Sequence, residues 1–277
     1  MKTKKIIGYI GLYFLLAVML LITLFPIYWV LVTAIKPNAE MYNIIPNFWP
    51  ENPTLAHLST LFGKYKFAAG IKNSLIVSIV VSAVTIVFSF LAAYALARLK
   101  FRGRGGVLRG ILYAYLVPKA VLFIPLYMMV SSLGIANTLG SLILIYPTFT
   151  IPYATWMLVS YLKSIPVSLE EAAIIDGCNR WQSMLKIVLP LSMPGVVSTL
   201  IISFTLCWNE YLYAMVMIHD KAAKTMPLLL SEMIVGDVFA WGPLMAGAAV
   251  ASIPILILYL FGSSKMVGGL TVGGVKG

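Results

Sequence analysis

The polar residues that stand out in this chain are the few that interrupt its long apolar stretches. Lys119 follows Pro118, and Asn209, Glu210 and Tyr211 are consecutive. An ionisable side chain at the centre of a membrane-spanning helix costs about 2.5 to 3.5 kcal/mol on insertion scales, so such groups usually face protein or water. Helix packing, a position near the membrane interface and contact with a transported solute all stay open for these residues.

Residue sets typical of an enzyme or a metal centre are missing from the sequence. Cys178 and Cys207 lie in unlike surroundings, and His57 and His219 fall in short polar connections without a partner at ligand spacing. No paired acids, His and acid set, or nucleophile with a base appears beside the apolar stretches. A phosphate-binding G-x-x-x-x-G-K-[ST] loop is also missing. We therefore expect no metal centre, no bound cofactor and no ATP hydrolysis by this chain.

The composition indicates that a membrane protein positions these groups. Of the 277 residues, 61% are hydrophobic and 10% are charged, and the mean hydropathy is +0.95, whereas soluble domains have roughly 25% charged residues. A helix needs about 20 apolar residues to cross the hydrocarbon core. Six stretches meet this length, which predicts an all-α integral membrane protein with six transmembrane helices. They are residues 9–33, 71–97, 107–131, 139–161, 194–217 and 243–261.

The basic residues predict the orientation of these helices. Short loops rich in Lys and Arg stay in the cytoplasm, and the 98–109 connector carries five basic residues and no acid. The N-terminal lysines, Lys265 and Lys276 fall on the same side, so both termini are predicted to be cytoplasmic. The first apolar run, residues 6–35, is too long for a cleaved signal, whose apolar region has roughly 7 to 15 residues. We expect lipid around the chain and no nucleic-acid partner.

Three connections remain for the outer side of the membrane. They are residues 36–70, 132–138 and 219–242, and the first is rich in proline and asparagine, with a possible short helix from Thr54. Loops of this kind suit contact with an external partner. No internal repeat or low-complexity segment interrupts the chain, so residues 1–277 are interpreted as a single transmembrane domain.

A polar segment between the fourth and fifth apolar stretches is too long for a tight turn and too polar to cross lipid. Ser168 and Glu171 have the spacing of a capping box, which predicts a helix that starts at Ser168. Gly177 tolerates left-handed geometry and should end this helix. Asn179 is a plausible cap for a second helix, which Pro190 should end. Two short cytoplasmic helices that meet at a glycine are therefore predicted.

This segment, residues 163–190, resembles the cytoplasmic loop of the inner-membrane permeases of ABC importers. The pattern of that loop is E-A-A, three residues, G, nine residues, I-x-L-P. The chain matches all seven specified positions, which are Glu171, Ala172, Ala173, Gly177, Ile187, Leu189 and Pro190.

Further segments narrow the resemblance to permeases of carbohydrate importers, in particular the second, shorter permease of maltose-type systems, and extend it over nearly the whole chain. They are residues 33–40 (TAIKPNAE), 124–127 (IPLY), 133–139 (LGIANTL), 163–177 (KSIPVSLEEAAIIDG), 208–213 (WNEYLY) and 269–277 (GLTVGGVKG).

The resemblance implies a type I ABC importer permease fold and a role in ATP-driven import of a sugar, such as an oligosaccharide. It also implies that residues 168–176 form a coupling helix seated in a groove of a cytoplasmic ATPase. The implied coupling residues are Ser168, Glu170, Glu171, Ala172, Ala173, Asp176, Gly177, Ile187, Leu189 and Pro190.

The solute path of such a permease would involve the polar residues described first: Lys119, Asn209, Glu210 and Tyr211. Lys119 departs from the small or uncharged residue that the resemblance leads us to expect after Pro118. The sugar specificity of a relative is therefore not transferred to this chain.

The resemblance implies partners as well. They are a related second permease that completes a heterodimer, a homodimeric or paired cytoplasmic ATPase that carries ATP and Mg, and an extracytoplasmic sugar-binding protein, all at the bacterial cytoplasmic membrane. A glycerol-3-phosphate-type importer shares the same permease pattern and stays an alternative. An ion-coupled secondary transporter is a weaker alternative, because it should show matching inverted halves and more intramembrane carboxylates than Glu210.

Overall fold

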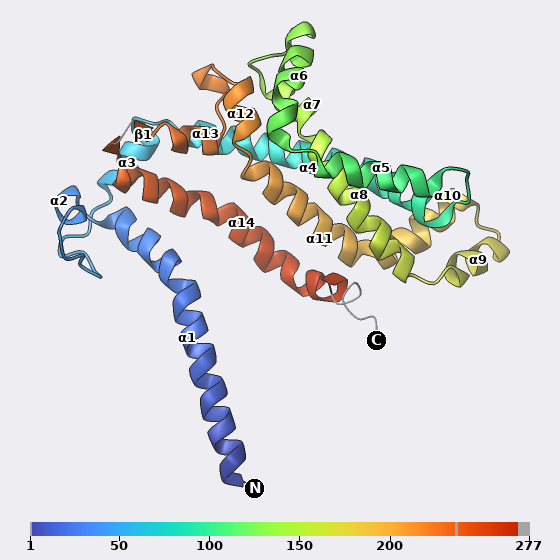
Figure 1. The fold of residues 1–277 in the computed structure, drawn as a ribbon, viewed down its shortest axis with the longest axis horizontal. Helices are drawn as coiled ribbons and strands as arrows, with labels where there is room; N and C mark the ends of the chain where they lie inside the picture. Colours follow the sequence, from blue (N-terminus) through green and yellow to red (C-terminus); the bar gives the residue numbers. More distant parts are fainter. Residues whose placement is uncertain (1, 236–237, 271–277) are drawn as a thin grey trace. The chain divides into compact units, whose positions relative to one another are not determined.

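The computed structural model describes residues 2–235 and 238–270, and the described chain is almost entirely helical (Figure 1). Five helices are long and apolar enough to cross a membrane, and a bent helix pair would supply a sixth span. The predicted all-α membrane fold is therefore confirmed. Residues 271–277, which include Lys276 and most of the GLTVGGVKG tail, lie outside the described residues.

Two compact units can be distinguished along the chain. The first unit comprises residues 1–68 and 229–253. Its elements are α1 (Lys2–Ile35), α2 (Asn38–Met41), α3 (Ala56–Gly63), the second half of α13 (Met226–Ser231), the antiparallel strands β1 (Ile234–Val235) and β2 (Val238–Phe239), and the first part of α14 (Trp241–Leu270).

Close backbone packing joins α3 to the start of α14 inside the first unit. A Cβ atom on Gly242 would overlap the imidazole ring of His57. The Nε2 atom of His57 lies 2.8 Å from the backbone oxygen of Lys36 at the end of α1, at hydrogen-bonding distance. The buried His57 therefore links three segments of this unit.

The second unit comprises residues 69–228 and 254–277. Its elements are most of α4 (Phe67–Arg98), α5 (Arg104–Leu116), α6 (Lys119–Ser132), α7 (Leu139–Ile145), α8 (Pro147–Ser164), α9 (Ser168–Ile175), α10 (Arg180–Ser183), the π-helical turn η1 (Met184–Val188), α11 (Leu189–Trp208), α12 (Leu212–Met217) and the short η2 (Lys221–Ala223).

The long helices of the second unit pack through small polar residues. Helix α8 packs against α5 and α11, and the hydroxyl oxygens of Thr85 on α4 and Thr150 on α8 lie 2.6 Å apart. Ser89 on α4 donates to the backbone oxygen of Ile151, at 3.2 Å. Small hydroxyl residues let membrane helices approach closely and bond across the interface. Thr85 and Ser89 belong to a row of small, buried hydroxyl residues along α4: Ser74, Ser78, Ser82, Thr85 and Ser89.

The third predicted span, residues 107–131, is not one straight helix. Helices α5 and α6 meet at a bend of 95°. Val117 is extended, with ψ of 125°, and Pro118 caps α6. A proline ring disfavours helical geometry in the residue before it, so the chain leaves the helix at Val117. The third predicted span is therefore a bent helix pair.

The fifth predicted span, residues 194–217, also differs from the structure. Helix α11 ends at Trp208, and a separate helix, α12, starts at Leu212. The break occurs where the Glu210 carboxylate accepts hydrogen bonds from the first turn of α12, at 3.0 Å from the nitrogen of Tyr213 and 3.2 Å from that of Ala214. A side chain that accepts hydrogen bonds from the first turn of a new helix favours that start over continuation of the preceding helix. The apolar character of the segment did not reveal this break.

Candidate functional site

The 163–190 loop contains the two short helices that the sequence predicted. Helix α9 runs from Ser168 to Ile175 and α10 begins at Arg180, and the two contact each other beyond the end of α8 (Figure 1). Gly177 adopts φ of +91°, a left-handed geometry that glycine tolerates. The nitrogen of Cys178 donates to the oxygen of Ala173 and that of Gly177 to Ile174, which is a Schellman ending. The predicted end of the first helix at Gly177 is confirmed.

The capping box predicted for Ser168 and Glu171 was wrong. Val167 is the N-cap residue, no side chain caps α9, and the nitrogen of Glu171 donates to the oxygen of Val167. Ser168 already lies inside the first turn, because the chain turns helical directly after Pro166, and its hydroxyl is therefore one position too late to serve as the cap.

The capping box of this loop is instead at the start of α10. The Asn179 side chain accepts from the nitrogen of Gln182 at 2.9 Å, and the Gln182 side chain accepts from the nitrogen of Asn179 at 2.9 Å. Asn179 was predicted as a cap, and this prediction is confirmed. Asn179 and Gln182 have the same spacing in the sequence as Ser168 and Glu171. The capping box was predicted at Ser168 and Glu171 because Ser and Glu are the more typical residues of this motif.

Pro190 does not end the second helix as predicted. The chain passes from α10 through η1 into α11 without a break, and Pro190 lies in the first turn of α11. The nitrogen of Leu189 donates to the oxygen of Met184, a spacing of five residues. This wider turn fits a proline, which lacks a backbone donor and clashes in a regular helix. The I-x-L-P end of the motif therefore continues directly into a span.

The two faces of α9 differ sharply in exposure. Glu170 and Ala173 are buried on the inner face, whereas Glu171 and Ala172 are exposed. Both carboxylates were predicted to be available to a partner, but the structure leaves only that of Glu171 at the surface.

The buried Glu170 carboxylate is bound inside the chain. Arg98, the last residue of α4, forms an ion pair with it through Nε, and the Tyr94 hydroxyl donates to its other oxygen at 3.0 Å. Arg98 also donates through Nη2 to the backbone oxygen of Ile165 at 2.8 Å. Sequence reasoning assigned Arg98 only to topology and overlooked Tyr94, because their pairing joins residues more than 70 positions apart and has no local signal.

Large apolar side chains cover the exposed face of α9 and α10. Ile175 is 85% exposed and Trp181 is 65% exposed. Helix α9 lies outside the candidate spans, so lipid does not explain its exposed apolar residues, whereas Trp181 and Leu185 belong to the candidate span Arg180–Trp208. Extensive apolar exposure outside a membrane marks a site of contact with another protein. The surface, called the α9–α10 face below, consists of Val167, Leu169, Ile174, Ile175, Trp181 and Leu185.

The candidate solute-path residues fall into two groups. Lys119 and Glu210 both contact one aromatic pair, since Lys119 Nζ lies 3.8 Å from the centroid of the Phe149 ring, Phe149 stacks on Tyr213, and Glu210 accepts from the Tyr213 nitrogen. The Tyr213 hydroxyl donates to the backbone oxygen of Lys119 at 3.3 Å. Glu210 is buried and holds the start of α12.

Asn209 and Tyr211, the other two candidates, are exposed on either side of Glu210. The structure thus links Lys119 and Glu210 through Tyr213 and leaves Asn209 and Tyr211 at the surface.

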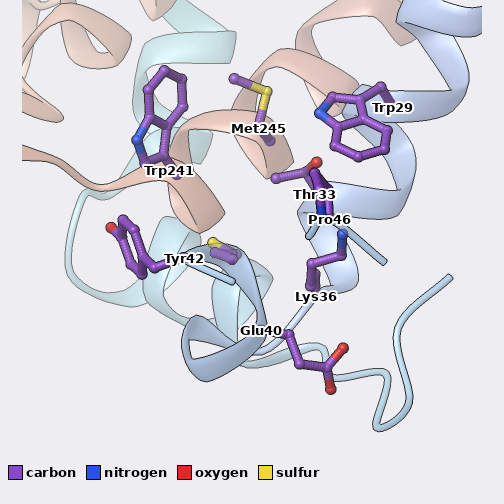
Figure 2. Close-up of a pocket in the computed structure, with 9 residues that line it drawn as sticks. Trp29, Thr33, Lys36, Glu40, Tyr42, Pro46, Trp241 and Met245 are labelled. Atoms are coloured by element: carbon purple, nitrogen blue, oxygen red, sulfur yellow. The ribbon is translucent and has the colours of Figure 1, made fainter. Parts of the chain in front are cut away.

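A cavity of about 280 Å³ occupies the first unit and is shown in Figure 2. Aromatic side chains supply much of its wall, and the TAIKPNAE segment supplies its charged groups. Its lining residues are Trp29, Thr33, Lys36, Glu40, Met41, Tyr42, Pro46, Trp241 and Met245.

The charged groups of this cavity serve the fold of the loop after α1. Lys36 Nζ donates to the backbone oxygen of Asn47 at 2.7 Å and lies 4.9 Å from the Trp29 ring centroid. The Glu40 carboxylate accepts from the nitrogens of Glu51 and Asn52, at 3.1 Å and 3.3 Å. The TAIKPNAE segment therefore anchors its own loop, which is a structural use for both of its charges.

Comparison with known proteins agrees with this arrangement. Residues 85–265 match the family described as binding-protein-dependent transport system inner membrane component. The chain is 37% identical over 276 residues to the inner membrane ABC transporter permease protein YcjP of Escherichia coli (strain K12), with 99% of each chain covered. It is 36% identical over 264 residues to the diacetylchitobiose uptake system permease protein DasC of Streptomyces coelicolor, with 94% of this chain and 95% of the relative covered.

A solved structure has the same fold. The chain is similar to one from a bacterial ABC transporter involved in the import of the acidic polysaccharide alginate, with a TM-score of 0.79 and 20% identity over 95% of this chain and 98% of the other.

The chain therefore belongs to the family of binding-protein-dependent transport system inner membrane components. The resemblance drawn from the E-A-A pattern is confirmed, as is the type I importer permease fold. Members of this family are multi-pass transport subunits, so the chain is a transport component and not an enzyme.

Proposed function

We propose that this chain is one of two permease subunits of an ATP-driven sugar importer, in which it forms half of the translocation path. A cytoplasmic ATPase, which binds ATP and Mg, docks on the α9–α10 face and drives the change between inward and outward access. A related second permease completes the path, and an extracytoplasmic binding protein delivers the sugar. This arrangement places both termini and the 163–190 loop in the cytoplasm, in line with the basic 98–109 connector.

The exposed α9–α10 face is the observation that carries this proposal. It presents six large apolar side chains and the Glu171 carboxylate beside the small, exposed Ala172. Interfaces between proteins combine apolar anchors of this kind with a few charged groups at the rim. Because η1 continues directly into α11, a force applied to this face reaches a span without passing through a flexible loop.

The names of similar proteins support a carbohydrate as the solute. The relative from Streptomyces coelicolor is named for uptake of diacetylchitobiose, a disaccharide derivative, and the structurally similar transporter imports alginate, a polysaccharide. Lys119 beside Phe149 offers a cation and an aromatic ring within one region of the second unit. An oligosaccharide with an acidic or hydroxyl-rich ring is compatible with such groups.

Association with the ATPase tests this proposal. The tagged chain, produced with its second permease and ATPase, should co-purify with both in mild detergent, and Ile175→Glu should weaken recovery of the ATPase by about tenfold or more. Leu55→Glu is the matched control, since it places the same charge on an exposed apolar side chain in the loop predicted to face outside. The control should leave recovery unchanged.

Transport by the reconstituted complex identifies the solute. Uptake of labelled oligosaccharides into proteoliposomes should depend on ATP and on the binding protein. Competition by glycerol-3-phosphate at low concentration would favour the phosphate-ester alternative, and uptake by the isolated chain along an ion gradient, without the ATPase, would contradict the importer.

A further inference from the structure

The cluster formed by Arg98, Glu170 and Tyr94 lies where α4 meets the 163–190 loop. The ion pair between Arg98 and Glu170 is almost fully buried, with 5% and 8% of the two side chains exposed. Both oxygens of Glu170 are engaged, one by Arg98 and the other by Tyr94. Glu170 therefore binds α4 through both of its oxygens, and its burial keeps it from the surface that a partner protein would contact.

The surroundings of this cluster are apolar. Tyr94 belongs to a core formed with Leu158 and Leu162 of α8 and with Met184 and Val188 of η1. Charges buried in such a core are held in place by their partners, because an unpaired buried charge is strongly unfavourable. The ion pair thus fixes α9 at a point where α4, α8 and η1 also meet.

Helix α9 needs such an attachment. It has eight residues, and an isolated helix of this length is unstable in water. Its inner face offers only Glu170 and the small Ala173 as buried residues. The contact between Glu170 and Arg98 is consequently a buried side-chain link between α9 and α4, in addition to the packing of α9 on η1 and α10.

Helix α4 is suited to transmit a movement of α9. It runs from Phe67 to Arg98 without an internal proline, over 32 residues, which corresponds to about 48 Å at 1.5 Å per residue. By contrast, α6, α8, α11 and α14 each contain a proline. Proline interrupts the hydrogen bonds of a helix and permits bending, so α4 is the stiffest route from the loop across the unit.

We infer that Arg98, Glu170 and Tyr94 form a clamp that makes α4 move together with α9, and that they are positioning residues for coupling between ATP hydrolysis and transport. This inference rests on the proposed function, because it assigns a path to the force that the ATPase exerts on α9. Arg98 extends the clamp to the α8–α9 linker through its bond to the Ile165 oxygen, at 2.8 Å. Glu171 contacts the ATPase, whereas Glu170 transmits the movement.

The test measures solute transported per ATP hydrolysed, in proteoliposomes that contain the complete complex. Glu170→Gln should retain the ATPase and hydrolyse ATP at close to the normal rate, while transport per ATP falls by about tenfold. Arg98→Gln should have the same effect, and Arg98→Lys should restore part of the ratio because it keeps the positive charge. Tyr94→Phe removes only the hydroxyl and keeps the ring in the core, so it supplies a milder variant if the others fail to fold.

The outcomes separate this inference from the proposed function. If Ile175→Glu weakens ATPase association as expected but Glu170→Gln and Tyr94→Phe keep the normal transport per ATP, the clamp is wrong and the proposed function stands. Loss of ATPase association in Glu170→Gln would also overturn the clamp, because Glu170 would then act at the interface. If Ile175→Glu has no effect on ATPase association, docking of the ATPase on the α9–α10 face is wrong, and the proposed function is contradicted before the clamp is tested.

Discussion

The carboxylate of Glu210 lies 3.0 Å from the backbone nitrogen of Tyr213 and accepts its hydrogen bond at the start of α12. A second bond from the nitrogen of Ala214 occupies the other carboxylate oxygen. Glu210 is buried, so its charge is stabilised by backbone donors at the positive end of a helix. This role explains an acid inside a largely apolar segment without any contact with solute.

Glu210→Ala should destabilise the chain. It leaves two buried donors without partners, and the expected loss is about 2 kcal/mol or more in the free energy of unfolding. Glu210→Gln keeps one oxygen acceptor and should lose less. Thermal unfolding in detergent measures both, with the exposed Asn209→Ala as the control that should be close to neutral. A stable Glu210→Gln complex that fails to import would instead support a place in the solute path.

The start of α10 should depend on Asn179 and not on Ser168. Asn179→Ala removes a cap whose bond to the nitrogen of Gln182 measures 2.9 Å, and caps of this type contribute about 1 kcal/mol. Ser168→Ala should be neutral for stability, because Ser168 lies inside α9 and caps nothing. Equal losses in the two variants, measured by thermal unfolding, would contradict the capping assignment.

Much of this fold was predictable because lipid imposes simple rules on the sequence. Apolar length located the spans, and Gly177 correctly marked the end of α9. Apolar length alone did not show the sharp bend at Pro118. Pro190, which was predicted to end a helix, instead lies in the first turn of α11, after a wider helical turn. The E-A-A pattern identified the loop but not its orientation, since the burial of Glu170 depends on Arg98, 72 residues earlier in the chain. Pairings between distant helices leave no periodicity that sequence reasoning can use.

Gly195 should be intolerant of any side chain. A Cβ atom there would lie 2.5 Å from the Tyr161 ring, where α11 crosses α8. Overpacking of this kind costs about 1 to 3 kcal/mol, so Gly195→Ala should lower the unfolding temperature in detergent. Gly110→Ala is the matched control, because a Cβ atom at Gly110 meets nothing within 4 Å. Combining Gly195→Ala with Tyr161→Ala should recover part of the loss.

Gly177 should tolerate asparagine better than valine. Its φ of +91° lies in the left-handed region, where a β-branched residue is strained by roughly 1 to 2 kcal/mol and asparagine by less. Gly177→Val should therefore displace α10 from α9 and reduce ATP-driven uptake more than Gly177→Asn does. Equal uptake by the two variants would show that the turn between α9 and α10 does not need this geometry.

The central claim is that the exposed face of the 163–190 loop seats an ATPase. The most direct measurement is affinity purification of the tagged chain with and without Glu171→Lys, followed by identification of the co-purifying proteins and an ATPase assay. We predict that the wild type recovers a second permease and an ATPase, and that Glu171→Lys weakens both the association and the activity. A chain that is recovered alone, stable and unchanged by Glu171→Lys would contradict the account.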